Sequence, residues 1–383
     1  MSEIRKHLTI NDPEEKEIIS RLDKQMDFKS LRLKKLLALP DLTKREHSPV
    51  KILFDQILKL SRFKDFDIVD FPRVVTVEEN FDLLNTPKDH PSRRETDTYY
   101  VDENHVLRTQ MTVMWSFYLK DKEILKKLEE KGEIMALSQG IVFRKDEIDR
   151  NHYPAFHQID GLYVCKKSKK VITQKDLEEV QIDLAKGIFG NDIEYKFLVD
   201  TFPFTDPSVE MDIKFNNEWL EVNGAGLVHK EVLKNFGLDP EVYNGWAFGF
   251  GDRLAMIKMG IPDIRILWSD DERITSQFKD INSKFKPVSK YPPITRDISF
   301  IVNSDMSLNS YYEIVRDIGG DLIEEMKLLD KYADDKKFGK DKISYTFRIV
   351  YRSLERTLTN EEINILHEKI VDKTKVTFNA EIR

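Results

Sequence analysis

The feature that most constrains the fold is a series of short β-type runs that begins at Asp67. Several of them alternate apolar and polar residues, as antiparallel strands with one solvated face do. Helical periodicity interrupts the series at roughly 110–131, 173–189 and 228–236. The region to about residue 280 therefore predicts one large antiparallel sheet flanked by helices, an α+β architecture. The runs are DIVDF, RVVTV, DTYYV, IMALSQGIVFR, GLYVC, EYKFLV, EMDIKF and EWLEVNGAG.

Two helices are expected before the sheet. Residues 12–38 predict one helix, which Asp12 or Asn11 is placed to cap. Its apolar side chains fall near one face, at Ile18, Leu22, Met26 and Leu31. A second helix is expected at 48–61, where Ser48 precedes Pro49 in the usual order of cap and proline.

The proline-rich stretch FKPVSKYPPI, near residues 284–293, predicts a linker. A compact β-α-β-β-α-β pattern follows it, the order of the ferredoxin-like arrangement. Thr359, with Glu362 three residues on, predicts a capping box for the second helix, and VTFNAEI predicts a closing strand. We therefore expect an N-terminal helical extension at 1–46, a catalytic domain at 47–283 and a ferredoxin-like domain at 284–383.

The charge balance limits the possible partners. The net charge of −7 argues against a nucleic-acid coat protein, although a local patch could still grip an RNA. Residues 286–383 hold 17 basic and 17 acidic side chains, so this segment is neutral. The longest apolar runs are too short to cross a bilayer, which predicts no membrane partner. The acidic start is unlike a targeting peptide, so we expect a cytoplasmic protein, with a processed organellar form (mitochondrial matrix or another organelle) as the alternative.

The segment 140–164 reads strand, polar loop, strand, with Arg144 at the end of the first strand. A cation there indicates either a bound anion or a surface pair with Asp146 or Glu147, and the pattern favours neither. His152 and His157 lie five residues apart, which is not the spacing of a zinc-binding HExxH helix. A histidine that hydrogen-bonds a phosphate or the backbone is the commoner case.

The segment 200–226 offers an aromatic pair and a set of acids. Phe202 and Phe204 flank Pro203, and the two rings predict either an edge-to-face wall for a third ring or two core side chains. The acids Glu210, Asp212 and Glu221 project from strands. Such carboxylates are either solvated or hold a hard cation such as Mg²⁺ or a substrate ammonium.

The stretch GWAFGFGDR, 245–253, is neither a dinucleotide-binding fingerprint nor a P-loop, because the third glycine and the Gly-Lys-Ser/Thr are missing. It does place Arg253 in the first turn of a helix, directly after a glycine turn at Gly251 that lets backbone approach a ligand.

Taken together, these motifs resemble, in order, those of the phenylalanyl-tRNA synthetases of the single-chain mitochondrial type. The resemblance runs from about Ser48 to the C-terminus. It implies a class II catalytic domain followed by a ferredoxin-like anticodon-binding domain. It also implies a ligase that joins phenylalanine to ATP as an adenylate and passes the acyl group to tRNA(Phe). The motifs are HPSRRETDTYY, VFRKDEIDRNHYPAFHQIDGL, FPFTDPS, WLEVNGAGLVH, GWAFGFGDRLAMIKMGIPDIRILWSDDER, SKYPPITRDISF and YRSLERTLT.

The resemblance also implies roles at the ATP site. Arg144 matches the arginine on the α-phosphate, and Arg253 the one on the γ-phosphate. Phe156 matches the aromatic under the adenine, and His152 a residue near the triphosphate. Further ATP contacts are implied at Asp146 and Gly251. Glu210 matches an acid that binds Mg²⁺.

For phenylalanine, the family's aromatic wall matches Phe202 and Phe204, and the pocket floor matches Ala247 and Phe248. Thr112 takes the place of a substrate-contacting serine. The polar group around the amine matches Gln158, Asp160 and Glu221. The candidate tRNA-binding cations of the last domain are Lys290, Arg296, Arg352 and Arg356. A fused anticodon-binding domain implies a monomer.

Five departures from the family pattern bear on substrate choice. GFGDR is one residue shorter than the family's motif, so the turn before Arg253 must close differently. Asp160 and Asp146 stand where the family has Glu. Trp115 replaces a glutamine, and Asn223 replaces a leucine. Two alternatives therefore stay open: a paralogue that activates another aromatic amino acid, and a non-catalytic tRNA-binding protein.

Overall fold

The structure is a computed structural model, which describes residues 5–288 and 291–383. The described residues form two compact units. The first comprises the chain up to Phe143 with Ala155–Ile261 and Phe278–Lys284, and the second comprises Arg144–Pro154, Pro262–Gln277 and Phe285–Arg383. None of the helices in these described ranges has the length and apolar character that crossing a membrane requires.

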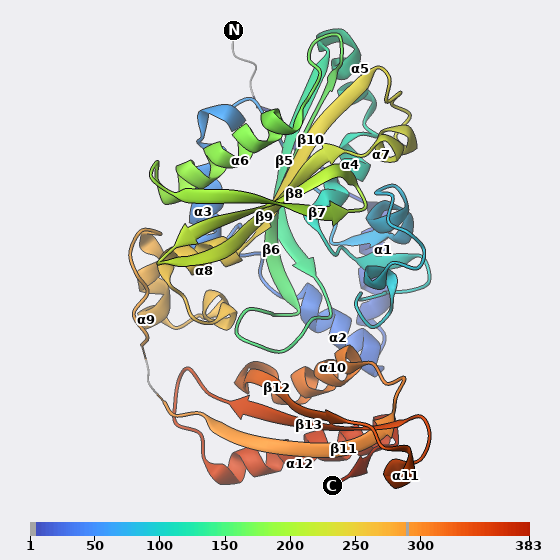
Figure 1. Cartoon of the computed structure of the whole chain (residues 1–383), viewed down its shortest axis with the longest axis vertical. Coiled ribbons are helices and arrows are strands. Elements are labelled where there is room, and N and C mark those ends of the chain that lie inside the picture. Colours follow the sequence, from blue (N-terminus) through green and yellow to red (C-terminus); the bar gives the residue numbers. More distant parts are fainter. Residues whose placement is uncertain (1–4, 289–290) are drawn as a thin grey trace. The chain divides into compact units, whose positions relative to one another are not determined.

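An eight-stranded sheet forms the centre of the first unit (Figure 1). Its strands are β1 (His7–Thr9), β2 (Asp67–Asp70), β5 (Glu133–Phe143), β6 (Ala155–Lys166), β7 (Glu194–Phe202), β8 (Thr205–Phe215), β9 (Glu218–Val228) and β10 (Tyr243–Gly251). They lie in the order β1-β2-β5-β6-β10-β9-β8-β7. Every neighbouring pair in the part β5-β6-β10-β9-β8-β7 is antiparallel, which confirms the predicted sheet. The pairs β1–β2 and β2–β5 are parallel. A separate ribbon pairs β3 (Val74–Thr76) with β4 (His105–Leu107).

Helices cover both faces of this sheet. They are α1 (Pro13–Asp23), α2 (Phe28–Leu37), α3 (Pro49–Leu58), α4 (Met114–Tyr118), α5 (Lys122–Lys131), α6 (Gln174–Phe189), α7 (Lys230–Asn235) and α8 (Arg253–Met259). Figure 1 shows α3 and α6 on one side of the sheet, with α4 and α7 on the other. On the first side, the ring of Phe250 meets Phe54 of α3 with centroids 6.2 Å apart, and Phe248 meets Phe63 at 5.6 Å.

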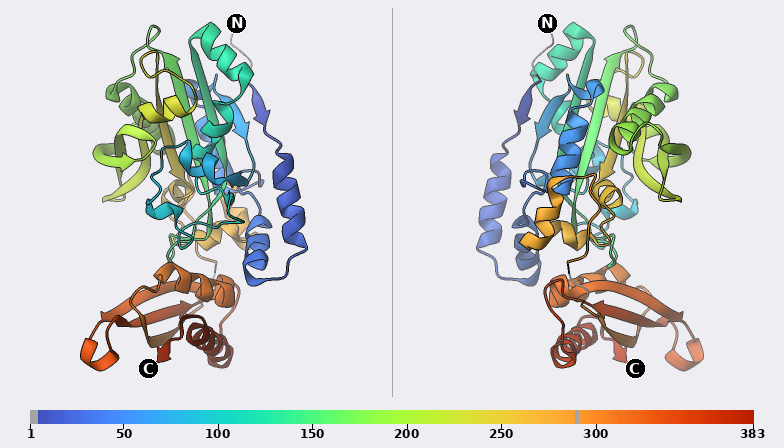
Figure 2. Two further views of the ribbon diagram at one scale, coloured as in Figure 1. Left: turned by 90° about the vertical axis from the view of Figure 1, so that its right-hand side faces the viewer. Right: turned by 90° about the vertical axis from the view of Figure 1, so that its left-hand side faces the viewer.

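The prediction of one helix over 12–38 is wrong. Two helices, α1 and α2, lie side by side (Figure 2), and Asp12 caps the first as expected. The second begins afresh because the Asp27 carboxylate accepts hydrogen bonds from the Ser30 backbone N–H at 3.0 Å and the Ser30 hydroxyl at 2.6 Å. The turn between them leaves Met26 75% exposed and Leu31 44% exposed, so neither joins the buried face.

The same local chemistry divides the region predicted as one helix at 110–131. Asp121 accepts hydrogen bonds from the backbone N–H groups of Glu123 and Ile124, and so caps α5 separately from α4. Ser48 occupies the N-cap position of α3, but its side chain makes no capping hydrogen bond. A proline at the first helical position, which needs no N–H partner, is enough to start that helix.

The second unit has the predicted ferredoxin-like fold. Its elements are α9 (Glu272–Thr275), β11 (Ile294–Asn303), α10 (Leu308–Gly319), β12 (Ile323–Tyr332), α11 (Asp335–Phe338), β13 (Lys342–Tyr351), α12 (Asn360–Phe378) and β14 (Glu381–Ile382). The strand order is β12-β13-β11-β14, and every pair is antiparallel.

The capping box at Thr359 and Glu362 is confirmed at the start of α12. The closing strand is shorter than VTFNAEI predicted. The helix continues to Phe378, and Asn379 ends it in the left-handed conformation. Two residues are then left for β14, because α12 takes the first three residues of the predicted strand and the turn takes the next two.

The buried ring of His157 joins three segments of the first unit. Its Nε2 accepts a hydrogen bond from the Leu42 backbone N–H at 3.0 Å, which places the ring proton on Nδ1. Nδ1 lies 3.3 Å from the Asp252 carboxylate, which also accepts from the His157 backbone N–H at 2.9 Å. The Asp252 backbone N–H returns a bond to the His157 carbonyl at 2.9 Å. One neutral imidazole thus ties the N-terminal extension and the start of α8 to strand β6.

We predict that His157→Ala lowers the free energy of unfolding by about 3 kcal/mol, because it leaves a cavity and buried backbone groups without partners. Three of the four tryptophans (Trp115, Trp219 and Trp246) belong to the first unit, so tryptophan fluorescence during urea unfolding reports this change. His157→Gln is the matched variant: its amide oxygen can take the place of Nε2, so the loss should be smaller. Equal midpoints for wild type and His157→Ala would contradict the assignment.

Candidate active site

Strand β10 carries large side chains on one face and small residues on the other. Trp246, Phe248 and Phe250 point to the side of α3, whereas the alternate positions are Gly245, Ala247, Gly249 and Gly251. The neighbouring strand β9 continues the row of small residues, with Gly226 opposite Ala247 and Gly224 opposite Gly249. On this face, which forms a floor of small residues, β10 therefore carries no side chain larger than a methyl group from Gly245 to Gly251, whereas Phe202 and Thr205 lie over Gly224 and Gly226 of β9.

This alternation corrects one predicted site residue. Ala247 lies on the small-residue face, but Phe248 does not share that floor with it. The Phe248 ring is 1% exposed and fills the space above Gly161, where a Cβ would lie 2.4 Å from the ring. Phe248 is thus a core residue of the opposite face, because adjacent residues of a strand point to opposite sides.

Phe156, Gln158 and Asp160 lie on the small-residue face of β6, two residues apart. Gln158 accepts a hydrogen bond from the Met111 backbone N–H at 3.1 Å. Asp160 stands directly opposite Gly249, and a Cβ at Gly249 would lie 3.3 Å from its Oδ2 atom. The structure thus brings three of the predicted site residues into one row beside the floor.

Asp160 is the most unusual group of this face. Its carboxylate is 4% exposed and accepts hydrogen bonds from the Thr112 hydroxyl at 2.8 Å and the Trp115 indole N–H at 2.9 Å. Burial raises the pKa of Asp160 to about 7, and the two donors oppose that rise. Among the described residues, no lysine, arginine or histidine forms an ion pair with it. A buried anion that meets only neutral donors is a site for an incoming cation.

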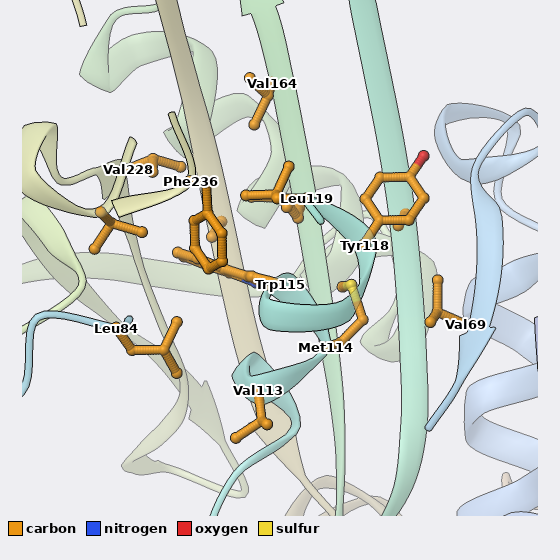
Figure 3. Close-up of a cluster of buried hydrophobic side chains, with 14 of the residues drawn as sticks. Val69, Leu84, Val113, Met114, Trp115, Tyr118, Leu119, Val164, Val228 and Phe236 are labelled. Carbon is orange, nitrogen blue, oxygen red and sulfur yellow. The ribbon is translucent and has the colours of Figure 1, made fainter. Parts of the chain in front are cut away.

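Trp115 connects Asp160 to an aromatic wall. Trp115 itself is fully buried in the apolar cluster that Figure 3 shows, and its ring meets Phe204 in a T-shaped contact with centroids 5.8 Å apart. Phe202 and Phe204 are stacked at 5.8 Å with an interplanar angle of 7°, so the predicted edge-to-face geometry between these two is wrong. Phe202 lies over Gly224, where a Cβ would be 2.6 Å from the ring. Sequence reasoning noted Trp115 as a departure but missed this bond to Asp160.

The acids of β8 and β9 form a separate group. Burial, then the charge of Glu221, then a hydrogen bond with Asp212 raise the pKa of Glu210 to about 7. Asp212 forms an ion pair with Lys196 at 3.1 Å. Glu221 is thus grouped with Glu210, and no hydrogen bond among the described residues joins it to Gln158 or Asp160. Repulsion between these carboxylates would be relieved by a bound cation.

Asn223 lies outside this face. It pairs with Met211, whose side chain packs with Ala185 of α6 on the other side of the sheet. The expectation that this substitution borders the amino-acid pocket is therefore wrong, because Gly224, not Asn223, points to the floor.

At the end of β10, the strand runs directly into α8. Gly251 is the last strand residue, Asp252 is held by His157, and Arg253 is the first helical residue. The shortened motif thus closes with a single residue between strand and helix. Arg253 is exposed, and its guanidinium has no hydrogen bond or ion pair among the described residues. Such a cation is available to an anionic ligand.

The loop 144–154 belongs to the second unit and carries Arg144, Asp146 and His152. Burial lowers the pKa of the Arg144 guanidinium, and the charge of Asp146 opposes this. His152 Nδ1 lies 2.8 Å from the Asp149 carboxylate, and this hydrogen bond raises the pKa of His152. Glu147, Asp149 and His152 bring their ligand atoms within 4.8 Å of one another, a grouping that the spacing of histidines had not indicated. Exposed acidic groups of this kind are common without an ion.

The predicted tRNA-binding cations are mostly engaged within the fold. Arg296 donates to Asn364 at 2.9 Å and to Asn360 at 2.8 Å. Arg352 pairs with Glu324, and Arg356 makes two bonds of 2.8 Å to Glu362. Lys290 lies outside the described residues. These three arginines therefore stabilise their own unit, and contact with a phosphate would have to compete with those bonds.

Two family models match the chain. Residues 35–278 match the tRNA synthetases class II core domain (F), and residues 289–383 match the ferredoxin-fold anticodon binding domain. A phenylalanine–tRNA ligase, chloroplastic/mitochondrial, from Arabidopsis thaliana is 40% identical over 89% of this chain and 80% of its own length. The mitochondrial phenylalanine–tRNA ligase of Mus musculus is 37% identical over 83% and 75%. That of Saccharomyces cerevisiae is 32% identical over 88% of each chain.

These relatives correct the expected location. All three are organellar proteins by name, which points to mitochondria and overturns the expectation of a cytoplasmic protein. The expectation of a cytoplasmic protein, which was based on the acidic start of the chain, is wrong.

Proposed function

The chain belongs to the phenylalanine–tRNA ligases of the class II tRNA synthetases, and from this premise we propose that it activates phenylalanine with ATP and transfers the phenylalanyl group to tRNA(Phe). In the first step, the phenylalanine carboxylate attacks the α-phosphorus of ATP and pyrophosphate leaves. In the second, a hydroxyl of the terminal ribose of the tRNA attacks the acyl carbon, loses its proton, and AMP leaves. ATP is a substrate of this reaction.

The observation that carries the proposal is the buried Asp160 carboxylate beside a glycine floor and an aromatic wall. A zwitterion with a flat apolar side chain fits this combination: the ammonium meets Asp160 and Gln158, and the ring rests between Phe204 and Ala247. Thr112 holds Asp160 and lies beside the amine. This assigns the ammonium to a buried carboxylate that forms no ion pair with a lysine, arginine or histidine among the described residues.

For the nucleotide, the proposed roles rest on the family motifs. Arg144 holds the α-phosphate and Arg253 the γ-phosphate, since a forked guanidinium stabilises charge that develops on phosphate oxygens. Phe156 supports the adenine, and Asp146, His152 and Gly251 are further ATP contacts. Catalysis then consists of positioning and electrostatic stabilisation, with no covalent enzyme intermediate.

We propose that Glu210, with Asp212 and Glu221, would hold Mg²⁺. Burial and then the charge of Glu221 raise the pKa of Glu210, and a hard divalent ion beside this carboxylate would offset both effects. When bound, the ion shields the phosphate oxygens of ATP.

The division of labour along the chain is also part of this proposal. Residues 1–46 form an extension, 47–283 the catalytic domain and 284–383 the anticodon-binding domain, in which Lys290, Arg296, Arg352 and Arg356 are the candidate tRNA contacts. Since both domains lie in one chain, we propose that the protein works as a monomer.

We expect amino-acid-dependent ATP–pyrophosphate exchange with phenylalanine. Arg253→Ala should reduce this exchange by about a thousandfold, because no other side chain replaces the missing hydrogen-bond donor to the phosphate. Arg62→Ala, which breaks only a surface ion pair with Asp183, is the control. A panel of all twenty amino acids decides the alternatives. Faster exchange with tyrosine than with phenylalanine would support the paralogue, and exchange with none of them would support a non-catalytic protein.

A second prediction concerns pH. The substrate ammonium binds the ionised form of Asp160. Because the pKa of Asp160 is about 7 in the free enzyme, the carboxylate becomes protonated as the pH falls and no longer attracts the ammonium. We expect the KM for phenylalanine in exchange to be about tenfold higher at pH 6 than at pH 8, following the ionised fraction of a group with that pKa. A KM that is constant over this range would refute the assignment.

Trp115→Phe sharpens that test. It removes the indole N–H that favours the ionised form, so the rise in KM should begin at a higher pH than in the wild type. Trp246→Phe is the matched control, since Trp246 lies on the opposite face of the sheet, stacked on Tyr163. Identical shifts in both variants would mean that the effect is one of packing alone.

A third prediction concerns the metal. Glu210→Gln removes one anionic ligand, so the Mg²⁺ concentration that gives half-maximal exchange should rise by about tenfold or more. Glu194→Gln, which removes an acid paired with Lys214 on the neighbouring strand, should leave the Mg²⁺ requirement unchanged. An unaltered requirement in Glu210→Gln would exclude this carboxylate as a ligand.

A further inference from the structure

Helix α2 has two faces, and only one of them is used by the fold. Ser30, Leu33 and Leu36 are buried, as expected for a helix that packs on its unit. The other face carries a stripe at the i, i+3, i+4, i+7 spacing: Phe28, Leu31, Arg32 and Lys35. Phe28 is 49% exposed and Leu31 is 44% exposed, and Met26 on the turn before them is 75% exposed. Large apolar side chains left together on a surface indicate an interaction site.

The same segment is strongly basic. Residues 24–35 hold five lysines and arginines and a single aspartate, a local charge of +4 in a chain of net charge −7. That aspartate, Asp27, is occupied by the two hydrogen bonds that cap the helix. Lys34 is turned back onto the Gln25 carbonyl at 2.7 Å. Within the described residues, no carboxylate forms an ion pair with Lys24, Lys29 or Lys35. These three ammonium groups are therefore available to an external anion.

The aromatic side chain of the stripe is prepared for a polyanion as well. The Arg32 guanidinium lies over the Phe28 ring, 4.6 Å from its centroid. From Phe28 to Lys35 the helix rises by about 10 Å, so cations recur along it over a distance that covers more than one phosphate of a nucleic acid. An RNA backbone thus matches the cations, and an unpaired base or ribose matches the exposed ring.

A membrane surface fits less well. An interfacial helix buries a continuous apolar face in the lipid. Here the apolar face of α2 is already packed in the protein, and the outer stripe has two apolar residues followed by two basic ones.

We propose that the outer stripe of α2, with Lys24, Lys29 and Lys35, is a contact surface for the tRNA substrate, in addition to the anticodon-binding domain. This inference rests on the proposed function, since it takes the polyanion to be the tRNA that the enzyme aminoacylates. Contacts to phosphates and stacking on the face of a base strengthen binding without reading the sequence of the tRNA.

The test compares two reactions of the full-length enzyme. In Lys24→Ala/Lys29→Ala/Lys35→Ala, ATP–pyrophosphate exchange, which needs no tRNA, should stay within twofold of the wild type. The KM for a tRNA(Phe) transcript in aminoacylation should rise about tenfold with kcat little changed. The slope of log affinity against log salt should become shallower by about two, because up to three phosphate contacts are lost. Lys122→Ala/Lys126→Ala/Lys175→Ala removes the same charge from exposed positions elsewhere in the unit and should change neither quantity.

Phe28→Ala separates stacking from charge: it should raise the KM for tRNA while leaving the salt slope unaltered. An unchanged KM and salt slope in the triple lysine variant would overturn the proposal. So would flotation of the wild type with vesicles that contain anionic lipid, if the triple variant lost flotation but kept its KM for tRNA. If instead the wild type shows no phenylalanine-dependent exchange, the proposed function fails, and direct binding of the transcript to the two triple variants still decides whether α2 contacts RNA.

Discussion

The arrangement of the first unit depends on one neutral imidazole. Because Nε2 of His157 accepts the Leu42 N–H, the ring cannot carry a proton there, and Nδ1 must face the Asp252 carboxylate. Asp252 precedes Arg253, so the same bonds that anchor the N-terminal extension also fix where α8 begins. Strand β10 can pass into α8 through the single residue Asp252 because hydrogen bonds with His157 hold that residue from the side. Arg253, the proposed phosphate-binding cation, therefore follows a residue that is held by hydrogen bonds to His157.

The second constraint is steric. Three aromatic rings lie on one side of residues 245–251 of β10 and only glycine and alanine on the other, where Gly249 and Gly251 stay partly exposed. Gly224 and Gly226 continue the row of small residues on β9, where Phe202 and Thr205 lie over them. Large aromatic side chains border this face at a few positions. Phe202 lies over Gly224, and Trp115 packs against Phe204. The pocket proposed for phenylalanine is thus defined by where side chains are missing and by the few aromatic rings that border the gap.

The sequence predicted the antiparallel sheet, the ferredoxin-like unit and the capping box at Thr359, since each depends on local periodicity or on residues three apart. The sequence-based prediction failed where one side chain caps a new helix, as Asp27 and Asp121 do, because the apolar periodicity of the sequence continues across the break between the two helices. It assigned Phe248 to the pocket because a family motif gives positions without saying which side of the strand they face. The roles of Trp115 and Asp160 were visible only as two departures 45 residues apart, and nothing local indicates that they bond to each other.

Charge compensation distinguishes the surfaces of this molecule. Arg296, Arg352 and Arg356 of the ferredoxin-like unit are bound by amides or carboxylates of their own fold, so they mainly add stability there. Asp160 and the Glu210 group are the reverse, since they are anions whose burial or mutual repulsion is not offset by a cation among the described residues, apart from the Lys196–Asp212 pair. The proposed ligands are an ammonium, a divalent ion and a polyanion, so the proposed function requires uncompensated charge of both signs. Lys24 and, on α2, Lys29 and Lys35 are the cations that we propose for the polyanion, because no carboxylate among the described residues forms an ion pair with them.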